Sequence, residues 1–532
     1  MATKRILVSD PISEKGVALL ADHPELEVDV NTGLAPEELL KIIPQYDGLI
    51  VRSQTTATAE VIEAATKLKA IGRAGVGVDN IDRDAATNNG VVVMNTPTGN
   101  TISTAEHAFS LLLSLARHIP QAHGSILAGR WDRKKYQGTE VNGKRLAVIG
   151  MGRIGAEFAK RAQAFGMTVV AYDPFLSAAR AEALKVELAE TVDQALTGAD
   201  CVTLHVPMTP DTKHIINADR IELLNKGALI VNCARGGLID EVALAAAVKS
   251  GRIGGAALDV FENEPPTLDQ AVFDSDERII FTPHLGASTN EAQENVGIQV
   301  AEQLRDFFTQ GAITNAVNMP SLDAKTAEEI GDYLELATSL GKLLSKLAPH
   351  QPDSLRVTYY GAVSELETSA ITRTALTGYL TASRQEGQVN LVNCAAIAKS
   401  MGLQITESTS AEEADFTELI KAEIVKGDEV YTVAGTFVGS APRIVNIEGQ
   451  AVETAIKGNF IIVKNDDRPG IVGTVGTVLA DKEINISNMS LSRNKDLGYA
   501  VNVIQLDSAA DESVINLLTE APGILAVTAV EL

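Results

Sequence analysis

The sequence predicts a multidomain α/β protein built around a doubly wound parallel sheet of the Rossmann type, and three observations support that fold class. The chain has 532 residues, and because single hydrophobic cores rarely exceed about 250 to 300 residues, roughly three or four domains are expected. The stretch from Lys144 to Asp173 has the pattern of strand, tight turn, helix and second strand, which is one βαβ unit. Around it, across residues 1–286, short apolar strands alternate with helical segments, the order that gives parallel sheets covered by helices.

A glycine fingerprint lies at the centre of the βαβ unit. Gly150, Gly152 and Gly155 stand in G-x-G-x-x-G spacing directly after the apolar run 145–149. The first glycine permits the turn, the second lets the backbone approach a pyrophosphate, and the third lets the helix pack closely on the strand. The free N–H groups at the start of that helix then bind the phosphates. A glycine-rich turn without a ligand is the alternative, but the strand before it and the helix after it favour a dinucleotide site.

Asp173, at the end of the second strand, indicates which dinucleotide binds. An acid at this place accepts hydrogen bonds from the adenosine ribose, and its charge repels a 2′-phosphate. The sequence therefore predicts NAD rather than NADP as the cofactor.

Composition and charge exclude several classes of protein. Hydrophobic residues make up 45% and charged residues 21% of the chain, and no apolar run reaches the roughly 18 residues that a membrane helix needs. The opening segment lacks the apolar core and cleavage site of a signal peptide, so a cytoplasmic protein is expected. The formal net charge of −24 argues against nucleic acid or an anionic membrane as a partner, because both require a basic face. An anionic substrate would need a local cluster of arginines.

The cysteines indicate reduced thiols rather than a metal site. Cys201, Cys233 and Cys394 are odd in number and widely spaced, with no C-x-x-C pair. They fit free thiols in a reducing compartment. The sequence therefore predicts no metal.

The first predicted domain, residues 1–99, is a small α/β domain in which two strands end in arginine, Arg52 and Arg73. Open α/β sheets bind ligands at the carboxyl ends of their strands. Each arginine is therefore either a ligand or a solvated loop residue, and neither interpretation is favoured for one arginine taken alone.

The dinucleotide domain is predicted to cover residues 100–286, with a helix from Asn100 to His118 as the link from the first domain. A helix from Thr289 to Phe308 follows and is expected to return the chain to the first domain. That domain is therefore predicted to be discontinuous and to include residues 287–320.

The C-terminal part has a different character. Residues 321–452 contain a long amphipathic helix and further strands without a catalytic constellation, which predicts a structural or interaction domain. Residues 458–532 follow the order strand, helix, strand, strand, helix, strand. That order, βαββαβ, is a ferredoxin-like unit.

Three segments at strand ends of the dinucleotide domain supply a cation, a carboxylate and an imidazole: Arg235 in CARGG, Glu264 in DVFENEPP and His284 in TPHLGAST. Reduction of a keto acid needs all three groups, because the ketone oxygen gains charge as the hydride arrives and must be protonated and stabilised. A carboxylate beside an imidazole raises the imidazole pKa, and a guanidinium can bind the substrate carboxylate and polarise the ketone. Taken singly, a strand-end histidine and a capping acid are the ordinary explanations, but their joint placement after the fingerprint favours a catalytic site.

These segments resemble the D-isomer-specific 2-hydroxyacid dehydrogenase family and, within it, the long form of the D-3-phosphoglycerate dehydrogenases. The resemblance runs from Arg5 to Pro320 through VRSQT, GRAGVGVDNID, GMGRIG, VNCARGGLID, GAALDVFENEPP and TPHLGAST. It continues by layout alone through an intervening domain similar to allosteric substrate-binding domains, and then into an ACT domain whose first turn is NDDRPG. It implies a Rossmann domain, a flavodoxin-like substrate domain, an α+β intervening domain and a ferredoxin-like ACT regulatory domain.

The resemblance also implies roles for individual residues. The catalytic residues would be Arg235, Glu264 and His284. NAD contacts are implied for Val76, Gly150, Gly152, Arg153, Ile154, Gly155, Asp173, Val206, Cys233, Ala234, Arg235, Asp259, His284, Gly286 and Ala287. Substrate contacts are implied for Arg52, Ser53, Arg73, Gly75, Asn100, Arg133 and Arg235. Asp467 and, across the same turn, Asn485 would bind an amino-acid effector.

The implied activity is the NAD-dependent oxidation of 3-phospho-D-glycerate to 3-phosphohydroxypyruvate, the first step of L-serine biosynthesis, in a homodimer or homotetramer. Two alternatives remain open. A hydroxypyruvate or glyoxylate reductase would not need phosphate-binding arginines or a sensor domain, and an NAD-sensing scaffold protein would not need an intact catalytic set. L-serine is the expected effector of the ACT domain, and dimerisation through sheet edges is the structural alternative.

Overall fold

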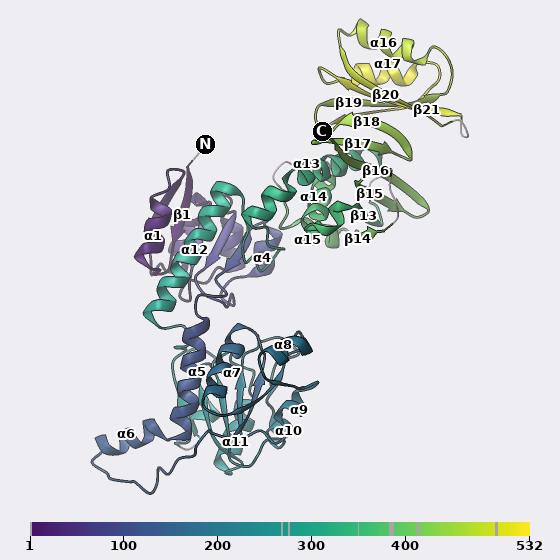
Figure 1. The fold of residues 1–532 in the computed structure, drawn as a ribbon. Helices are drawn as coiled ribbons and strands as arrows, with labels where there is room; N and C mark the ends of the chain where they lie inside the picture. Colours follow the sequence, from purple (N-terminus) through teal and green to yellow (C-terminus); the bar gives the residue numbers. More distant parts are fainter. Residues whose placement is uncertain are drawn as a thin grey trace.

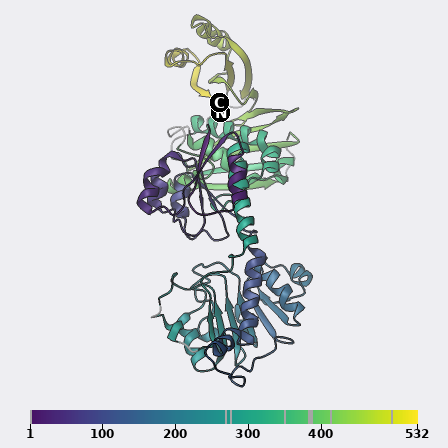
Figure 2. The same cartoon turned by 90° about the vertical axis from the view of Figure 1, so that its left-hand side faces the viewer.

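The computed structural model describes residues 3–267, 270–274, 277–348, 351–381, 388–411, 415–494 and 498–532. It contains four sheets, which Figure 1 shows as a row of units with the seven-stranded sheet at one end and the C-terminal sheet at the other. The turned view in Figure 2 again places the seven-stranded unit and the C-terminal unit at opposite ends. In the described part of the chain, none of the helices has both the length and the apolar composition that crossing a bilayer requires.

The first sheet contains five parallel strands in the order β2-β1-β3-β4-β5, which is the flavodoxin-like order and confirms the fold predicted for the substrate domain. Its elements are β1 (Lys4–Val8), α1 (Glu14–Ala21), β2 (Leu26–Val30), α2 (Pro36–Ile42), β3 (Gly48–Val51), α3 (Ala59–Ala64), β4 (Ala70–Arg73), α4 (Arg83–Asn88) and β5 (Val92–Asn95).

A helix from a distant part of the chain covers one face of this first sheet. Helix α12 (Asn290–Gln310) brings Val300 and Leu304 against Gly72 in β4, where an added Cβ would collide with both side chains. Absence of a side chain at position 72 thus allows the close approach of helix and sheet. The exact boundaries of the predicted domains stay predictions, but residues 290–310 pack on the first sheet.

The second sheet has seven parallel strands in the order β12-β11-β10-β9-β6-β7-β8, as the predicted doubly wound Rossmann fold requires. Its elements are β6 (Arg145–Ile149), α7 (Arg153–Ala164), β7 (Thr168–Tyr172), α8 (Ala178–Ala183), β8 (Glu187–Leu188), α9 (Val192–Leu196), β9 (Cys201–Leu204), α10 (Ala218–Ile221), β10 (Ala228–Asn232), α11 (Glu241–Lys249), β11 (Ile253–Leu258) and β12 (Ile279–Phe281).

Helix α5 (Thr101–Ala116) runs from the first sheet to the second and is slightly shorter than the predicted helix. The chain then turns at His118, whose φ is 52°. A second helix, α6 (Ile119–Leu127), follows with proline in its first turn, where the missing N–H costs no hydrogen bond. Figure 1 shows α6 and the segment after it as an arm that projects from the seven-stranded unit.

The third sheet has six strands in the order β14-β13-β15-β16-β17-β18 and mixes parallel and antiparallel pairs. Its elements are α13 (Ala324–Leu347), β13 (Ser354–Gly361), α14 (Thr368–Thr381), α15 (Cys394–Ser400), β14 (Gln404–Ser410), β15 (Glu418–Lys426), β16 (Glu429–Val438), β17 (Ala441–Ile447) and β18 (Gln450–Ala455). This is the α+β intervening unit expected from the resemblance.

The fourth sheet is antiparallel, in the order β20-β21-β19-β22, and its elements confirm the predicted βαββαβ order. They are β19 (Asn459–Asp466), α16 (Ile471–Asp481), β20 (Ile486–Asn494), β21 (Tyr499–Leu506), α17 (Glu512–Glu520) and β22 (Ile524–Glu531). One continuous cluster of buried apolar side chains, with members such as Ile6, Leu340 and Phe460, joins this sheet to the first and third. The seven-stranded sheet has separate clusters.

Candidate active site

A cavity of about 300 Å³ opens between the first and second sheets and is lined by residues of both. Residues predicted for the catalytic, NAD and substrate sites meet on its wall: Arg73, Val76, Asn100, Ile154, Val206, Cys233, Ala234, Arg235, His284, Gly286 and Ala287. They come from loops that follow strands of parallel sheets, where open α/β folds bind ligands. The structure therefore brings most of the predicted site into one place.

His284 and Glu264 form a hydrogen-bonded pair from two loops of the second sheet. Nδ1 of His284 lies 2.7 Å from Oε2 of Glu264, and Oε1 of Glu264 accepts the N–H of Phe261 at 3.0 Å. The hydrogen bond with Glu264 raises the pKa of His284, although burial opposes the shift. Burial would raise the pKa of Glu264, but the bonds from His284 and Phe261 outweigh it and lower that pKa. The geometry thus favours an imidazolium next to a carboxylate.

We expect Glu264→Gln to shift the pH profile of keto-acid reduction to lower pH. Reduction requires protonated His284, so the rate falls as pH rises through the histidine pKa. Since Glu264 raises that pKa, its removal lowers the pKa, and the high-pH limb of kcat moves down. The pH dependence of kcat in wild type and variant measures the shift. An unmoved limb would show that the two residues are not coupled.

Arg235 extends from the second sheet toward the first. Its Nε donates to Asp79 Oδ2 at 3.1 Å and its Nη1 to the carbonyl of Ala234 at 2.7 Å. Its own carbonyl accepts a hydrogen bond from Asn232 Nδ2 at 2.8 Å, so the loop that carries it is held by a buried amide. Asp79 was not predicted, although it stands in the GRAGVGVDN segment six residues after Arg73.

Arg73 is a second cation on this wall. Burial, followed by the charges of Arg235 and Arg52, lowers its pKa to about 10. Its Nε is buried and has no hydrogen-bond partner among the described residues. Gly75, with φ of 149°, leaves the space that the Arg73 guanidinium occupies. Arg235 and Arg52 thus lie close enough to disfavour the charge of Arg73, and an anion bound among these guanidinium groups would relieve that repulsion.

The glycine loop has the shape that a dinucleotide needs. Gly150 has φ of 94°, and an added Cβ would meet the carbonyl of His205, while a Cβ on Gly155 would meet the carbonyl of Gly150. By contrast, nothing lies within 4 Å of a Cβ on Gly152, which leaves room for a phosphate. Helix α7 then begins at Arg153 without a side-chain cap, so its first N–H groups are available to an anion. These residues fit the pyrophosphate of NAD.

Asp173 supports the same loop. Its Oδ2 accepts the N–H of Met151 at 2.8 Å, and its Oδ1 accepts the N–H of Phe175 at 2.8 Å. Each carboxylate oxygen keeps a lone pair for the hydroxyls of a ribose. The carboxylate therefore stands beside the phosphate-binding loop, as the ribose role requires.

Removing the Asp173 charge is expected to relax the preference for NAD. In Asp173→Ala and Asp173→Asn the 2′-phosphate of NADP no longer meets a carboxylate, and the ribose loses a charged acceptor, worth about 1.5–3 kcal/mol. The kcat/KM ratio of NAD to NADP should therefore fall roughly 10- to 100-fold. The asparagine variant is the matched control, since its amide oxygen can still accept the Met151 N–H. A wild type that uses both cofactors equally well would contradict the ribose role.

Asp259 anchors the loop that carries His284. Its buried carboxylate accepts hydrogen bonds from Thr282 Oγ1 (2.6 Å) and the N–H groups of Leu285 (2.7 Å) and Gly286 (2.8 Å), and its carbonyl accepts the N–H of His284 (2.9 Å). Burial would raise the Asp259 pKa, but hydrogen bonds outweigh it and lower that pKa. Asp259, for which the resemblance implies an NAD contact, thus also positions the loop that carries His284.

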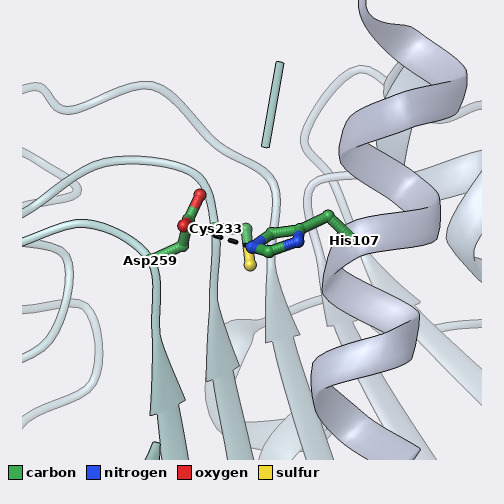
Figure 3. A group of neighbouring side chains, drawn as sticks. All are labelled: His107, Cys233 and Asp259. Carbon is green, nitrogen blue, oxygen red and sulfur yellow. Dashed lines mark hydrogen bonds and ion pairs between the residues drawn. The ribbon is translucent and has the colours of Figure 1, made fainter. Parts of the chain in front are cut away.

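His107 and Cys233 complete a group around Asp259 that could in principle hold a metal ion. Figure 3 shows His107 reaching from α5 toward Asp259, with Nε2 3.1 Å from Oδ1, and Cys233 on the neighbouring strand end. Burial and the Asp259 charge raise the Cys233 pKa well above its usual value, so it is a protonated thiol, a poor ligand. With its oxygens already taken by donors, Asp259 is a structural anchor, and His107 helps to hold it.

His205 is a further wall residue that the sequence did not reveal. Its side chain is partly buried, and desolvation lowers its pKa to about 3. Nε2 lies 3.0 Å from Thr203 Oγ1. A neutral imidazole of this kind packs under the glycine loop without adding charge. His107 lies within α5 and His205 directly follows β9. The sequence alone therefore does not distinguish either histidine from an ordinary core residue of its element.

Arg133 does not reach this cavity within one chain. Lys135, two residues further on, pairs with Glu277 at 2.9 Å, and Glu277 precedes β12, whereas His284 follows β12. Arg133 therefore lies toward the opposite edge of the sheet, on the arm. The substrate contact of Arg133 therefore stays a prediction, and the arm does not bring it to this cavity within one chain.

Asp467 and Asn485 are also separated. Asp467 follows β19 where that strand pairs with Tyr499, and its N–H donates to the carbonyl of Gly498. Asn485 precedes β20 and bonds Asp507 at 2.7 Å, beyond the other end of β21. Because β21 runs from Tyr499 to Leu506 between them, the two residues do not meet within one chain, and their shared role in effector binding stays a prediction.

The fold and this cavity define an NAD-dependent dehydrogenase. Family models match three segments: the NAD-binding domain of D-isomer specific 2-hydroxyacid dehydrogenases at residues 109–286, the intervening domain of D-3-phosphoglycerate dehydrogenase at 329–448, and the ACT domain at 460–523.

Relatives match over nearly the whole chain. D-3-phosphoglycerate dehydrogenase of Methanocaldococcus jannaschii is 42% identical over 99% of this chain and 100% of its own length. That of Bacillus subtilis is 40% identical over 99% of both. The chain belongs to the D-3-phosphoglycerate dehydrogenase family.

Solved structures of related enzymes resemble about three fifths of the chain. D-lactate dehydrogenase from Aquifex aeolicus, complexed with NAD and lactic acid, has a TM-score of 0.52 and 26% identity over 60% of this chain and 100% of its own. A glyoxylate reductase from Paecilomyes thermophila has a TM-score of 0.55 and 29% identity over 60% of this chain and 99% of its own. Both match about three fifths of this chain, and the Aquifex aeolicus enzyme was solved with NAD bound.

Proposed function

We propose that the chain oxidises 3-phospho-D-glycerate to 3-phosphohydroxypyruvate with NAD, the first step of L-serine biosynthesis. The observation that carries the proposal is the cavity whose wall brings His284, itself paired with Glu264, together with Arg235, Arg73 and Ile154 of the dinucleotide loop, with Arg52 near Arg73. Such a cluster offers partners for both anionic groups of a phosphorylated hydroxy acid. The names of the full-length relatives support the same substrate.

The residues act in defined roles. In oxidation, His284 accepts the proton of the 2-hydroxyl at Nε2, because its Nδ1 is engaged by Glu264, and in reduction it returns that proton to the ketone. Glu264 stabilises the imidazolium that forms. Arg235 binds the substrate carboxylate and stabilises negative charge on the reacting oxygen, and NAD, when bound, accepts the hydride.

A comparison of substrates tests this proposal. NADH consumption is measured with 3-phosphohydroxypyruvate, hydroxypyruvate, glyoxylate and 2-oxoglutarate. Under the proposal, kcat/KM is highest for 3-phosphohydroxypyruvate. Equal or higher values for hydroxypyruvate or glyoxylate indicate the reductase instead, and NADH binding without turnover of any of the four indicates the scaffold protein.

The fourth sheet is proposed to bind L-serine as a regulator. Asp467 supplies a carboxylate for the ammonium, although it now pairs with Arg493 at 2.8 Å. Helix α16 begins at Ile471, with Gly470 before it and without a side-chain cap. Its free N–H groups suit the serine carboxylate. When serine binds, Arg493 would release Asp467 and interact instead with solvent or with the carboxylate of the ligand.

Calorimetry tests the serine site. L-serine is titrated into wild type, Asp467→Ala and the control Asp507→Ala, which changes the far end of the same sheet. Heat should be lost in Asp467→Ala alone. Undiminished binding in that variant, or no binding to wild type, would contradict this site. The cytoplasmic location and a homodimer or homotetramer belong to the same proposal, the former supported by three buried free cysteines.

A further inference from the structure

A second buried carboxylate, Asp10, accepts hydrogen bonds from the loop that follows β3. Asp10 stands just after β1 and is 1% exposed. Its carboxylate accepts the N–H groups of Arg52 (2.6 Å), Gln54 (3.1 Å) and Thr55 (3.0 Å), and the hydroxyl of Thr55 (2.6 Å). Every partner is a donor, so the acceptor-only carboxylate fits this position better than an amide of the same size.

The carbonyl groups of the same loop are held from the other side. Nδ2 of Asn80 donates to the carbonyls of Arg52 (3.1 Å) and Thr55 (2.6 Å). Asn80 is adjacent to Asp79, which binds Arg235. The loop 52–55 is therefore fixed through both its N–H and its carbonyl groups, and it is tied to the segment that meets the catalytic arginine.

Ser53 is the exception in this loop. In the part of the chain that the structure describes, neither its N–H nor its hydroxyl has a protein partner, and the residue is exposed. Its neighbour Arg52 lies near enough to Arg73 to lower the pKa of that arginine. Asp10 thus engages the neighbouring N–H groups and leaves two donors of Ser53 beside two cations, an arrangement that suits a phosphate.

The geometry points to Asp10 as a positioning residue that orders loop 52–55 so that Arg52 and Ser53 bind the phosphate of the substrate. This inference rests on the proposed function and deepens it. The buried negative charge also lies among arginines, whose charged forms it favours. A plain loop anchor would hold the backbone equally but would not distinguish substrates with and without a phosphate.

Asp10→Asn tests the inference in the full-length enzyme. The variant turns one acceptor oxygen into a donor that faces backbone N–H groups, which should disorder the loop. KM for 3-phosphohydroxypyruvate is expected to rise about 10- to 100-fold, as loss of hydrogen bonds to a charged group implies. KM for hydroxypyruvate and kcat should change less than about threefold. The variant weakens phosphate binding equally in the ground state and the transition state, which raises KM for the phosphorylated substrate without lowering kcat. Inhibition by inorganic phosphate should weaken by a similar factor.

Two further variants complete the design. Thr55→Val removes one donor to Asp10 with little change of volume. It should raise KM for 3-phosphohydroxypyruvate and weaken inhibition by inorganic phosphate, each by about threefold to tenfold. It keeps the test decisive if Asp10→Asn fails to fold. Asp22→Asn changes an exposed carboxylate of the same unit and should leave all constants unchanged. NADH affinity, measured by fluorescence, should be unaltered in all three.

The outcomes separate this inference from the proposed function. Equal losses for phosphorylated and unphosphorylated substrates, or unchanged KM and phosphate inhibition in the folded variants, would overturn the role of Asp10 while wild type still prefers 3-phosphohydroxypyruvate. A wild type without that preference would instead overturn the proposed function.

Discussion

Replacing His284 by asparagine is expected to lower kcat by about 10² to 10⁴ in both directions, the usual effect of removing a general acid or base. The imidazole is the group paired with Glu264 on the cavity wall, and asparagine cannot carry a proton at neutral pH. Substrate and NADH affinities should change much less, because Arg235 and the glycine loop remain. Stopped-flow and steady-state measurement of NADH oxidation provide kcat and the binding constants.

The chain contains a matched control for this experiment. His214 pairs with Glu262 at 3.0 Å in the same unit, yet it is not part of the cavity wall. His214→Asn should therefore keep nearly full activity. A loss of less than about tenfold in His284→Asn, or a similar loss in both variants, would contradict the assignment of His284 as acid and base.

Replacing Arg235 by lysine is expected to lower kcat/KM by about 10² to 10³. Lysine keeps the positive charge but loses the planar fork that can bind a carboxylate and stabilise the reacting oxygen together. Lysine also cannot reproduce both present contacts, with Asp79 and the Ala234 carbonyl. The loss should appear for phosphorylated and unphosphorylated keto acids alike, since both carry the carboxylate.

An arginine of the same unit that lies outside the cavity controls for the substitution itself. Arg252 pairs with Glu222 at 2.8 Å away from the cavity, and Arg252→Lys should leave kcat/KM unchanged. Retention of wild-type kcat/KM in Arg235→Lys would show that charge alone suffices at this position. A loss confined to the phosphorylated substrate would move Arg235 to the phosphate-binding group.

Features that depend on local sequence were predictable. The Rossmann sheet and the βαββαβ unit follow from apolar periodicity and turn residues, whereas the flavodoxin-like order of the first sheet was implied by the family resemblance. Arg235, Glu264 and His284 could be brought together because each follows a strand of one parallel sheet, and parallel strands end at a common edge. For this reason the candidate site was largely visible before the structure.

Features that depend on register and on the far ends of elements were not predictable. Arg133 matched a motif, but the left-handed turn at His118 sends its arm toward the other edge of the sheet. The resemblance implies that Asn485 lies across the turn from Asp467. The register of β20, β21 and β19 instead places the two residues at opposite strand ends within one chain. Asp10 and Asp259 look like ordinary loop acids, because their donors come from residues far along the chain.

The continuous apolar core of the first, third and fourth sheets determines which parts of the protein can move when the cavity between the first two sheets opens. The wall that carries Arg73 belongs to a body that extends to the C-terminus, whereas the wall with Arg235 and the glycine loop belongs to a unit with its own cores. Only the segments before α5 and before α12 connect the two bodies along the chain. A hinge motion that releases the dinucleotide is therefore a rotation of the seven-stranded unit alone, and leaves the packing of the remaining sheets undisturbed.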